Sequence, residues 1–181
     1  KQAQLIMKEL YKGFDAPILF VSPESAELIK YAANSYLAVK LSYINEIADL
    51  CDKVGADIQQ VSFGIGLDPR IGNKYLASGV GFGGPALRQD TKVLQNLAKL
   101  NGVDLSLVDA ALKVNDNRSQ ALINKIKTVV GSCQGKKFAV LGLAYKGNTD
   151  DIRESPAFKV IDELLREDAK VVAYDSTSTT A

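Results

Sequence analysis

The sequence contains neither histidine nor tryptophan in its 181 residues, and it has only two cysteines, Cys51 and Cys133. Without histidine, the chain cannot supply a Ser-His-Asp or Cys-His relay, nor a histidine ligand for zinc. Proton transfer must therefore use Lys, Asp, Glu, Tyr or water. Two cysteines form neither a disulfide framework nor a metal cluster, so we expect no metal site and a protein of the reducing cytoplasm.

Neither sign of charge is in excess, because 22 Lys and Arg residues face 21 Asp and Glu residues. This balance argues against a protein held to nucleic acid or to a membrane surface by bulk charge. Long apolar runs are also missing: Ala16–Val21 is too short to span a bilayer. We therefore expect neither nucleic acid nor a membrane as a partner, and a composition of 46% hydrophobic residues suits a globular core.

The first half of the chain is predicted to be mainly helical. Residues 2–12 have helical spacing, and Ala16–Val21 has the pattern of a buried strand. Ser22, Pro23 and Glu24 then form a helix start, and the apolar periodicity that follows predicts a helix of about 30 residues that ends at Gly55. A helix of this length typically bridges parts of a molecule or packs along a symmetry mate.

Further along, the pattern predicts a short helix ending at Gly64 or Gly66, a loop over Leu67–Gly84, and helical segments over Pro85–Leu100 and Leu105–Val130. The composition then changes to a strand over Lys136–Tyr145, a helix over Ser155–Asp168 and a second buried strand over Lys170–Asp175. This order is typical of the first βαβ unit of a parallel-sheet nucleotide-binding domain. The expected fold is an all-helical middle flanked by α/β segments.

Two glycine-rich segments invite comparison with known motifs. Residues 79–84 satisfy G-x-G-x-x-G by letter, but no apolar strand precedes them. They indicate either a loop whose bare backbone approaches a ligand closely or a merely flexible connection. Residues 142–149 resemble a phosphate loop with Asn148 in place of its lysine. The nearby Lys146 can hold a phosphate or diphosphate, or it is an exposed lysine on a turn.

Lys30 and Asn34 are four residues apart on the predicted long helix and therefore share a face. Their neighbours on that face are apolar, so Lys30 is either a side chain that extends past them to water or a cation placed at a site. Asp90 follows the glycine loop near a helix start, where a carboxylate commonly stabilises the helix.

Four segments in order resemble one family: "ESAELIKYAANSYLAVKLSYINEIADLCDKVGAD", "DPRIG", "GVGFGG" and "LGLAYKGNTDDIRES". They are similar to the nucleotide-sugar 6-dehydrogenases of the UDP-glucose/GDP-mannose dehydrogenase family, and most of all to those that act on UDP-glucose. The resemblance implies the tail of an NAD-binding Rossmann domain over residues 1–21, and a central dimerisation domain with helices like those of the 6-phosphogluconate dehydrogenase C-terminal domain over 22–131. It also implies the start of a Rossmann-like UDP-binding domain over 132–181, NAD as cofactor, and a homodimer through the long helix.

The implied reaction oxidises the C6 alcohol of UDP-glucose to the carboxylate of UDP-glucuronate, a polysaccharide precursor, in two NAD-dependent steps through a thioester on cysteine. Lys30 and Asn34 match the cation and the hydrogen-bonding group at C6, Asp90 matches the residue that handles water, and Arg70 would reach a neighbouring subunit's substrate. Gln89 and Arg153 stand at NAD contacts. The matched substrate contacts are Lys30, Asn34, Arg70, Tyr75, Leu76, Ala77, Ser78, Gly79, Gly83, Tyr145 and Lys146.

The chain departs from the family at the catalytic loop, where the family has Gly-Phe-Gly-Gly-Ser-Cys-x-x-Lys-Asp. Ala86 stands at the position of the nucleophilic cysteine and Gln89 at that of the lysine. Since alanine cannot form a covalent adduct, we expect this chain alone to be inactive. It is then an altered copy of an enzyme, or a non-catalytic module for nucleotide-sugar binding and dimerisation. A β-hydroxyacid dehydrogenase, which needs no cysteine, is a less favoured interpretation, and a dehydrogenase of GDP-mannose or UDP-N-acetylmannosamine is a closely related one.

Overall fold

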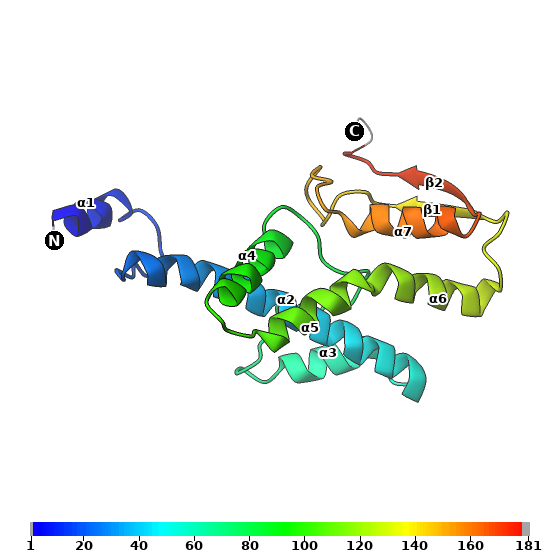
Figure 1. The fold of residues 1–181 in the computed structure, drawn as a ribbon, viewed down its shortest axis with the longest axis horizontal. Helices are drawn as coiled ribbons and strands as arrows, with labels where there is room; N and C mark the ends of the chain where they lie inside the picture. Colours follow the sequence, from blue (N-terminus) through cyan, green and yellow to red (C-terminus); the bar gives the residue numbers. More distant parts are fainter. Residues whose placement is uncertain (1, 179–181) are drawn as a thin grey trace. The chain divides into compact units, whose positions relative to one another are not determined.

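A computed structural model describes residues 2–178 of the chain (Figure 1). The structure divides into two compact units, Lys1–Lys30 and Tyr31–Ala181, with the boundary inside the long helix α2 (Pro23–Val54). Each unit is described by itself. Within the described residues, no helix is both long enough and apolar enough to cross a bilayer.

The first unit contains α1 (Gln2–Leu10) and the first turns of α2. The strand predicted at Ala16–Val21 is wrong, because these residues form no regular structure. A strand exists only when its backbone N–H and C=O groups pair with a neighbour. The two strands described in residues 2–178 pair with each other, and Leu19 is 72% exposed. An apolar run without a partner strand therefore stays irregular.

The long helix α2 confirms the prediction for residues 23–54. At its start, the Ser22 hydroxyl accepts a hydrogen bond from the backbone N–H of Ser25 at 3.3 Å, which satisfies one of the free donors of the first turn. At its end, Gly55 has a φ of +74°, the left-handed conformation that commonly terminates a helix. The predicted short helix is α3 (Ile58–Gly66), whose N-cap Asp57 accepts a hydrogen bond from the backbone N–H of Gln59.

Three more helices follow: α4 (Leu87–Leu100), α5 (Ser106–Asp116) and α6 (Arg118–Val130). The periodicity over Leu105–Val130 predicted one continuous stretch, whereas the structure has a junction at Asn117, whose φ is −89° and ψ is −4°. The sequence Asn-Asp-Asn at 115–117 explains the break, because such short polar side chains favour non-helical backbone conformations.

Helix α2 packs on α4 and α5 through side chains. Leu94, Val108 and Leu112 form a buried cluster with Tyr31 of α2 against it, and the Ser42 hydroxyl donates to the carbonyl of Ala111 at 2.7 Å. This packing brings the first turn of α4 close to α2, which decides the geometry of the site described below.

The last part of the second unit is the predicted strand-helix-strand unit: β1 (Lys137–Leu141), α7 (Pro156–Arg166) and β2 (Lys170–Tyr174). The two strands are parallel, with Lys137 opposite Lys170 and Leu141 opposite Tyr174. Figure 1 shows α7 beside this sheet, and α6 packs against α7. Their shared core contains Ile123, Cys133, Val160, Leu164 and Ala169.

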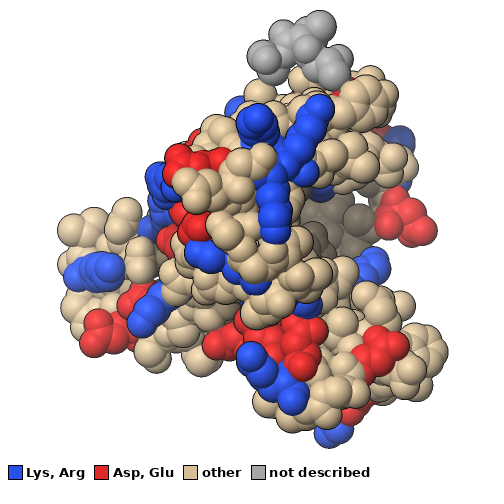
Figure 2. All heavy atoms as spheres, turned by 90° about the vertical axis from the view of Figure 1, so that its right-hand side faces the viewer, with Lys and Arg blue, Asp and Glu red and all other residues tan. Residues whose placement is uncertain are grey.

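Burial of the strands is less complete than predicted. Leu141, Val172 and Tyr174 are exposed, so β2 is not the buried strand that its sequence suggests. Figure 2 shows Lys and Arg side chains interspersed with Asp and Glu side chains, in keeping with the balanced composition.

Candidate functional site

A cavity of about 380 Å³ lies in the second unit, and we call it the Asn34 cavity. Its lining comes from helix α2, from the glycine loop (residues 79–84), from the start of α4 and from the loop after β1. Its volume is in the range of small-molecule sites, roughly 300–1,000 Å³. The lining residues are Asn34, Leu41, Tyr75, Gly81, Phe82, Gly83, Gly84, Ala86, Leu87, Tyr145 and Lys146.

Asn34 and Asp90 are joined directly, because the Asn34 amide donates a hydrogen bond to Asp90 Oδ2 at 2.6 Å. Asp90 is 9% exposed and lies in the first turn of α4, where the helix dipole favours a negative charge. Both of the sequence interpretations of Asp90, as a helix charge and as a site residue, are therefore compatible with its position. Lys30 lies one turn before Asn34 on α2 and is exposed, but it belongs to the first unit, so its role stays a prediction.

The glycine loop approaches other parts of the chain more closely than any side chain would allow. A Cβ on Gly83 would lie 1.9 Å from the carbonyl oxygen of Glu154, and one on Gly84 would lie 2.5 Å from the Tyr145 ring. The backbone N–H of Gly84 also donates to the carbonyl of Arg153 at 3.1 Å. Gly83 and Gly84 are thus explained by contact with the loop between β1 and α7, whereas the sequence interpretation invoked a ligand or flexibility.

Asn115 of α5 holds the same loop from the other side. Its Oδ1 accepts from the backbone N–H of Phe82 at 2.7 Å, and its Nδ2 donates to the carbonyl of Phe82 at 3.0 Å. A Cβ on Gly81 would lie 2.6 Å from this Oδ1, so the close contact needs glycine. Sequence analysis missed Asn115. The signal was its place in register with Val108 and Leu112 on the buried face of α5.

Ala86 is the N-cap residue of α4, and no side chain caps this helix start. The first N–H groups of a helix lack intrahelical partners, so the dipole of α4 contributes positive potential at this end of the cavity. Ala86 lines the cavity, whereas Cys51 and Cys133 are buried elsewhere as free thiols. Neither cysteine replaces a nucleophile at position 86.

The segment from Tyr75 to Gly79 is fixed by α2 and α3. The Ser62 hydroxyl donates to the carbonyl of Leu76 at 2.5 Å, and the N–H of Gly79 donates to Asn45 Oδ1 at 2.8 Å. Tyr75 has a φ of +61° and lines the Asn34 cavity, whereas residues 76–79 are outside its lining. Substrate contacts by Leu76, Ala77, Ser78 and Gly79 therefore stay predictions.

Arg70 and Arg153 are outside the lining of the Asn34 cavity. Each forms an ion pair at 2.6 Å with the aspartate two residues before it, Asp68 and Asp151, and both guanidinium groups are largely exposed. Hydrogen bonds from these guanidinium groups hold the pKa of the two carboxyl groups below its usual value.

Arg88, in contrast, is a partly buried cation near the loop. Its side chain is 14% exposed and bridges Asp116 at 2.6 Å and Glu154 at 3.3 Å. Beside it lies a cavity of about 200 Å³ whose lining includes Gln89, Arg88, Lys92 and Glu154. Arg88 thus joins α4 to α5 and to the segment before α7.

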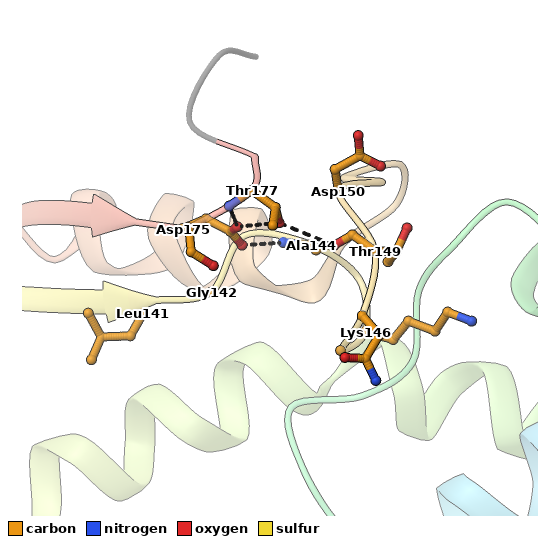
Figure 3. Close-up of a pocket in the computed structure, with 11 residues that line it drawn as sticks. Leu141, Gly142, Ala144, Lys146, Thr149, Asp150, Asp175 and Thr177 are labelled. Atoms are coloured by element: carbon orange, nitrogen blue, oxygen red, sulfur yellow. Dashed lines mark hydrogen bonds between the residues drawn. The ribbon is translucent and has the colours of Figure 1, made fainter.

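A larger cavity of about 850 Å³, the strand-end cavity, lies at the carboxyl ends of β1 and β2 (Figure 3). Lys146 lines both this cavity and the Asn34 cavity, and its ammonium group lies 5.6 Å from the centre of the Tyr145 ring. At its inner edge, Asp175 accepts hydrogen bonds from the N–H groups of Leu143 and Ala144 at 2.7 and 3.1 Å. Together with bonds from Thr177, these hold the pKa of Asp175 far below its usual value.

Comparison with known proteins matches two segments of the chain to domains of one family. Residues 24–117 match the central domain of the UDP-glucose/GDP-mannose dehydrogenase family, and residues 139–180 match its UDP-binding domain. The chain belongs to this family. It is 45% identical to the UDP-glucose 6-dehydrogenase TuaD of Bacillus subtilis over 96% of its own length and 38% of that protein. It is also 45% identical to a UDP-glucose 6-dehydrogenase of Rhizobium meliloti, over 96% of the chain and 41% of the relative.

Solved structures of this family have the same fold. A UDP-glucose dehydrogenase of Pyrobaculum islandicum superposes with a TM-score of 0.95 at 36% identity, covering 99% of this chain and 41% of that protein. A UDP-D-ManNAc dehydrogenase of Pyrococcus horikoshii gives a TM-score of 0.83 at 28% identity, covering 98% and 42%. The chain thus spans about two fifths of the length of these relatives. These matches favour this family over the β-hydroxyacid dehydrogenases.

Proposed function

We propose that the chain forms the sugar-nucleotide site of a UDP-glucose 6-dehydrogenase-like protein, with UDP-glucose as its ligand. The observation that supports this best is the Asn34–Asp90 hydrogen bond beside Ala86 at the edge of one cavity. Asn34 lines this cavity together with Ala86, which stands at the position of the family's nucleophile, and the backbone N–H of Asp90 donates to the Ala86 carbonyl at 2.8 Å. UDP-glucose is preferred to UDP-N-acetylmannosamine because the UDP-glucose relatives have the higher identity.

In this proposal different polar side chains bind different parts of UDP-glucose. Asn34 binds the oxygen at C6 of the sugar, and Asp90 orients water there. The role of Lys30 as a cation at C6 stays a prediction from the resemblance. Tyr75, Tyr145 and Lys146 hold the rest of the ligand, with the Lys146 ammonium group near the diphosphate. Arg70 is exposed and oriented by Asp68, so it is available to a neighbouring subunit's site.

NAD is the cofactor that the family implies, and the residues at its matched positions fit one part of it. Arg153 offers an exposed cation for a diphosphate, and Gln89 lines a cavity of about 200 Å³ that is smaller than a dinucleotide. When bound, NAD supplies a hydride acceptor for alcohol oxidation. In our proposal, Gln89 and Arg153 bind and orient it.

Ala86 limits the chemistry. Its methyl group forms no bond to an aldehyde carbon, so the thioester route to the acid is closed. Asn34 and Asp90 still bind and orient the sugar, which gives a ligand site without turnover. This favours a second candidate function, a non-catalytic module for nucleotide-sugar binding and dimerisation.

Helix α2 provides the face for such a dimer. Tyr36, Tyr43 and Leu50 recur every seven residues and are 62%, 52% and 56% exposed. A repeat of seven places these side chains in one seam, as in paired helices. We propose that two copies of the chain associate along this seam.

The binding proposal is tested by calorimetric titration of the chain with UDP-glucose. Asn34→Ala should weaken binding about tenfold, which corresponds to the loss of roughly one to two kcal/mol for a hydrogen bond. Asn124→Ala, on the exposed face of α6, is the matched control and should bind like the parent chain. Equal affinity of both variants would refute the site.

A second test addresses position 86. In Ala86→Cys the introduced thiol should react with iodoacetamide, whereas Cys51 and Cys133 are buried and stay protected. UDP-glucose should slow the alkylation, as measured by intact mass. If UDP-glucose leaves the rate unchanged although it binds, the ligand lies away from position 86.

A further inference from the structure

The Asp175 carboxylate fills a place that parallel-sheet nucleotide-binding units commonly leave to a ligand. In such units the turn after the first strand presents backbone N–H groups to a phosphate or diphosphate. Here the turn after β1 presents the N–H groups of Leu143 and Ala144, and both donate to Asp175 Oδ2. The carboxylate at the end of β2 is therefore the anion bound at this turn.

The Asp175 carboxylate is buried among its hydrogen-bond donors and is not a contact on the surface. Asp175 is 7% exposed, and its second oxygen, Oδ1, accepts from the N–H groups of Thr177 and Ser178 at 2.8 and 3.0 Å. The Thr177 hydroxyl adds a further bond at 2.9 Å. Figure 3 shows Asp175 between the loop after β1 and the segment after β2. Every polar contact of the carboxylate with these two segments uses it as an acceptor, which only the ionised form can fully satisfy.

The turn that Asp175 holds leads directly into the Asn34 cavity. Ala144 precedes Tyr145, whose N–H donates to the carbonyl of Asp151 at 3.0 Å and whose ring lies against the backbone of Gly84. Lys146 follows and extends away from Asp175 (Figure 3). The backbone of Tyr145, which precedes Lys146, is thus held from both ends of the turn.

We propose that Asp175 is a positioning residue for sugar-nucleotide binding: it occupies the N–H groups of the turn after β1, excludes a phosphate from them, and fixes Tyr145 and Lys146 toward the Asn34 cavity. This inference rests on the proposed function for the cavity itself. It adds that the nucleotide is held by the side chains of Tyr145 and Lys146, and not by the backbone amides of Leu143 and Ala144.

The proposal implies that removing the Asp175 charge weakens binding of an anionic ligand, whereas electrostatics alone predicts that its removal strengthens binding. Asp175 and Asp150 both line the strand-end cavity. Loss of either carboxylate makes the surroundings of an anionic ligand more positive, which by Coulomb's law strengthens its binding. Asp150 is exposed and its side chain makes no hydrogen bond among those described, so Asp150→Asn changes the charge alone. Asp175→Asn changes the same charge, but its single oxygen can serve only one of the two sets of N–H donors.

The first experiment titrates UDP into the chain and its variants by calorimetry. We expect Asp175→Asn to bind about tenfold more weakly, because charge-assisted hydrogen bonds that order the turn are lost. Asp150→Asn should bind as tightly as the parent chain or more tightly. Asp175→Ala should regain affinity in acetate, since the anion can enter the space that the carboxylate leaves. Unchanged or tighter binding by Asp175→Asn would overturn the proposal.

The second experiment starts from the parent chain. In NMR spectra of the parent chain, UDP should shift the backbone amide signal of Lys146 and the ring-proton signals of Tyr145, while the amide protons of Leu143 and Ala144 stay protected from exchange. Large shifts of those two amides on titration with UDP or inorganic phosphate would show that an external anion displaces Asp175, which overturns the proposal. If the parent chain binds no UDP, the proposed function fails. The positioning claim is then judged from amide exchange at residues 143–146 in Asp175→Asn against Asp150→Asn.

Discussion

Replacement of Asn115 by alanine should be among the most destabilising single polar substitutions in the second unit. The side chain is 7% exposed, and it serves both the N–H and the C=O group of Phe82. Truncation leaves these two backbone groups of a buried residue without partners. Since each unsatisfied group costs about 1–3 kcal/mol, the expected loss of unfolding free energy for the two groups is about 2–6 kcal/mol.

The assay is urea denaturation followed by circular dichroism, with Asn124→Ala as the control. Asn124 is exposed on α6, so the control should differ from the parent chain by less than about 0.5 kcal/mol. A third variant, Asn115→Asp, keeps the acceptor for the Phe82 N–H but places a carboxylate oxygen against the Phe82 carbonyl. Its deficit should shrink as the pH falls, because the protonated carboxyl group regains a donor. A deficit below about 1 kcal/mol for Asn115→Ala would refute this account of the loop.

Three further predictions concern two glycines, Asp175 and the exposed face of α2. Gly83→Ala should lower the free energy of unfolding by about 1–3 kcal/mol, because the added Cβ would overlap the carbonyl oxygen of Glu154. Gly64→Ala is the control within helix α3: its added Cβ would meet no atom within 4 Å, so it should raise the free energy of unfolding by up to about 1 kcal/mol in the same urea assay. The pKa of Asp175 is lower in the folded chain than in the unfolded one, so its contribution to stability is present above about pH 4 and is lost as the pH falls through the folded pKa. Acid unfolding followed by circular dichroism should therefore lack this pH-dependent loss of stability in Asp175→Asn. Identical acid transitions of the variant and the parent chain would contradict this prediction. Tyr43→Glu should shift the chain toward monomer in sedimentation equilibrium if α2 forms the dimer, and a parent chain that is already monomeric would rule the seam out.

The elements that the sequence predicted correctly are those with local signals. Helix α2 has a capping serine, an apolar period and a terminating glycine, and the strand-helix-strand unit has a capped helix between two apolar runs. Ala16–Val21 failed because strand formation depends on a partner that no local pattern reports. The division of α5 from α6 depends on a weak helix-forming triplet inside an otherwise continuous period.

In the candidate site, too, residues with a local sequence signal were predicted, and residues whose partners lie far along the chain were missed. The i, i+4 spacing on α2 drew attention to Asn34, and the structure places it against Asp90, 56 residues later. Asn115 and Asp175 went unnoticed because their partners lie about 30 residues away in the sequence, across a loop. Arg70 and Arg153 were matched by motif, but each binds a neighbouring aspartate in this chain, so their ligand roles stay predictions.

The hydrogen bond from Gly84 to Arg153 has a thermodynamic consequence. It ties the wall of the Asn34 cavity to the segment before α7, so opening the cavity also disturbs the contact between the helices and the βαβ unit. We therefore expect a molecule bound in that cavity to stabilise both parts together, by about 2.7 kcal/mol of unfolding free energy at a hundredfold excess over its dissociation constant. Thermal melting in the presence of nucleotide sugars thus offers a way to rank ligands that does not depend on an assay of turnover.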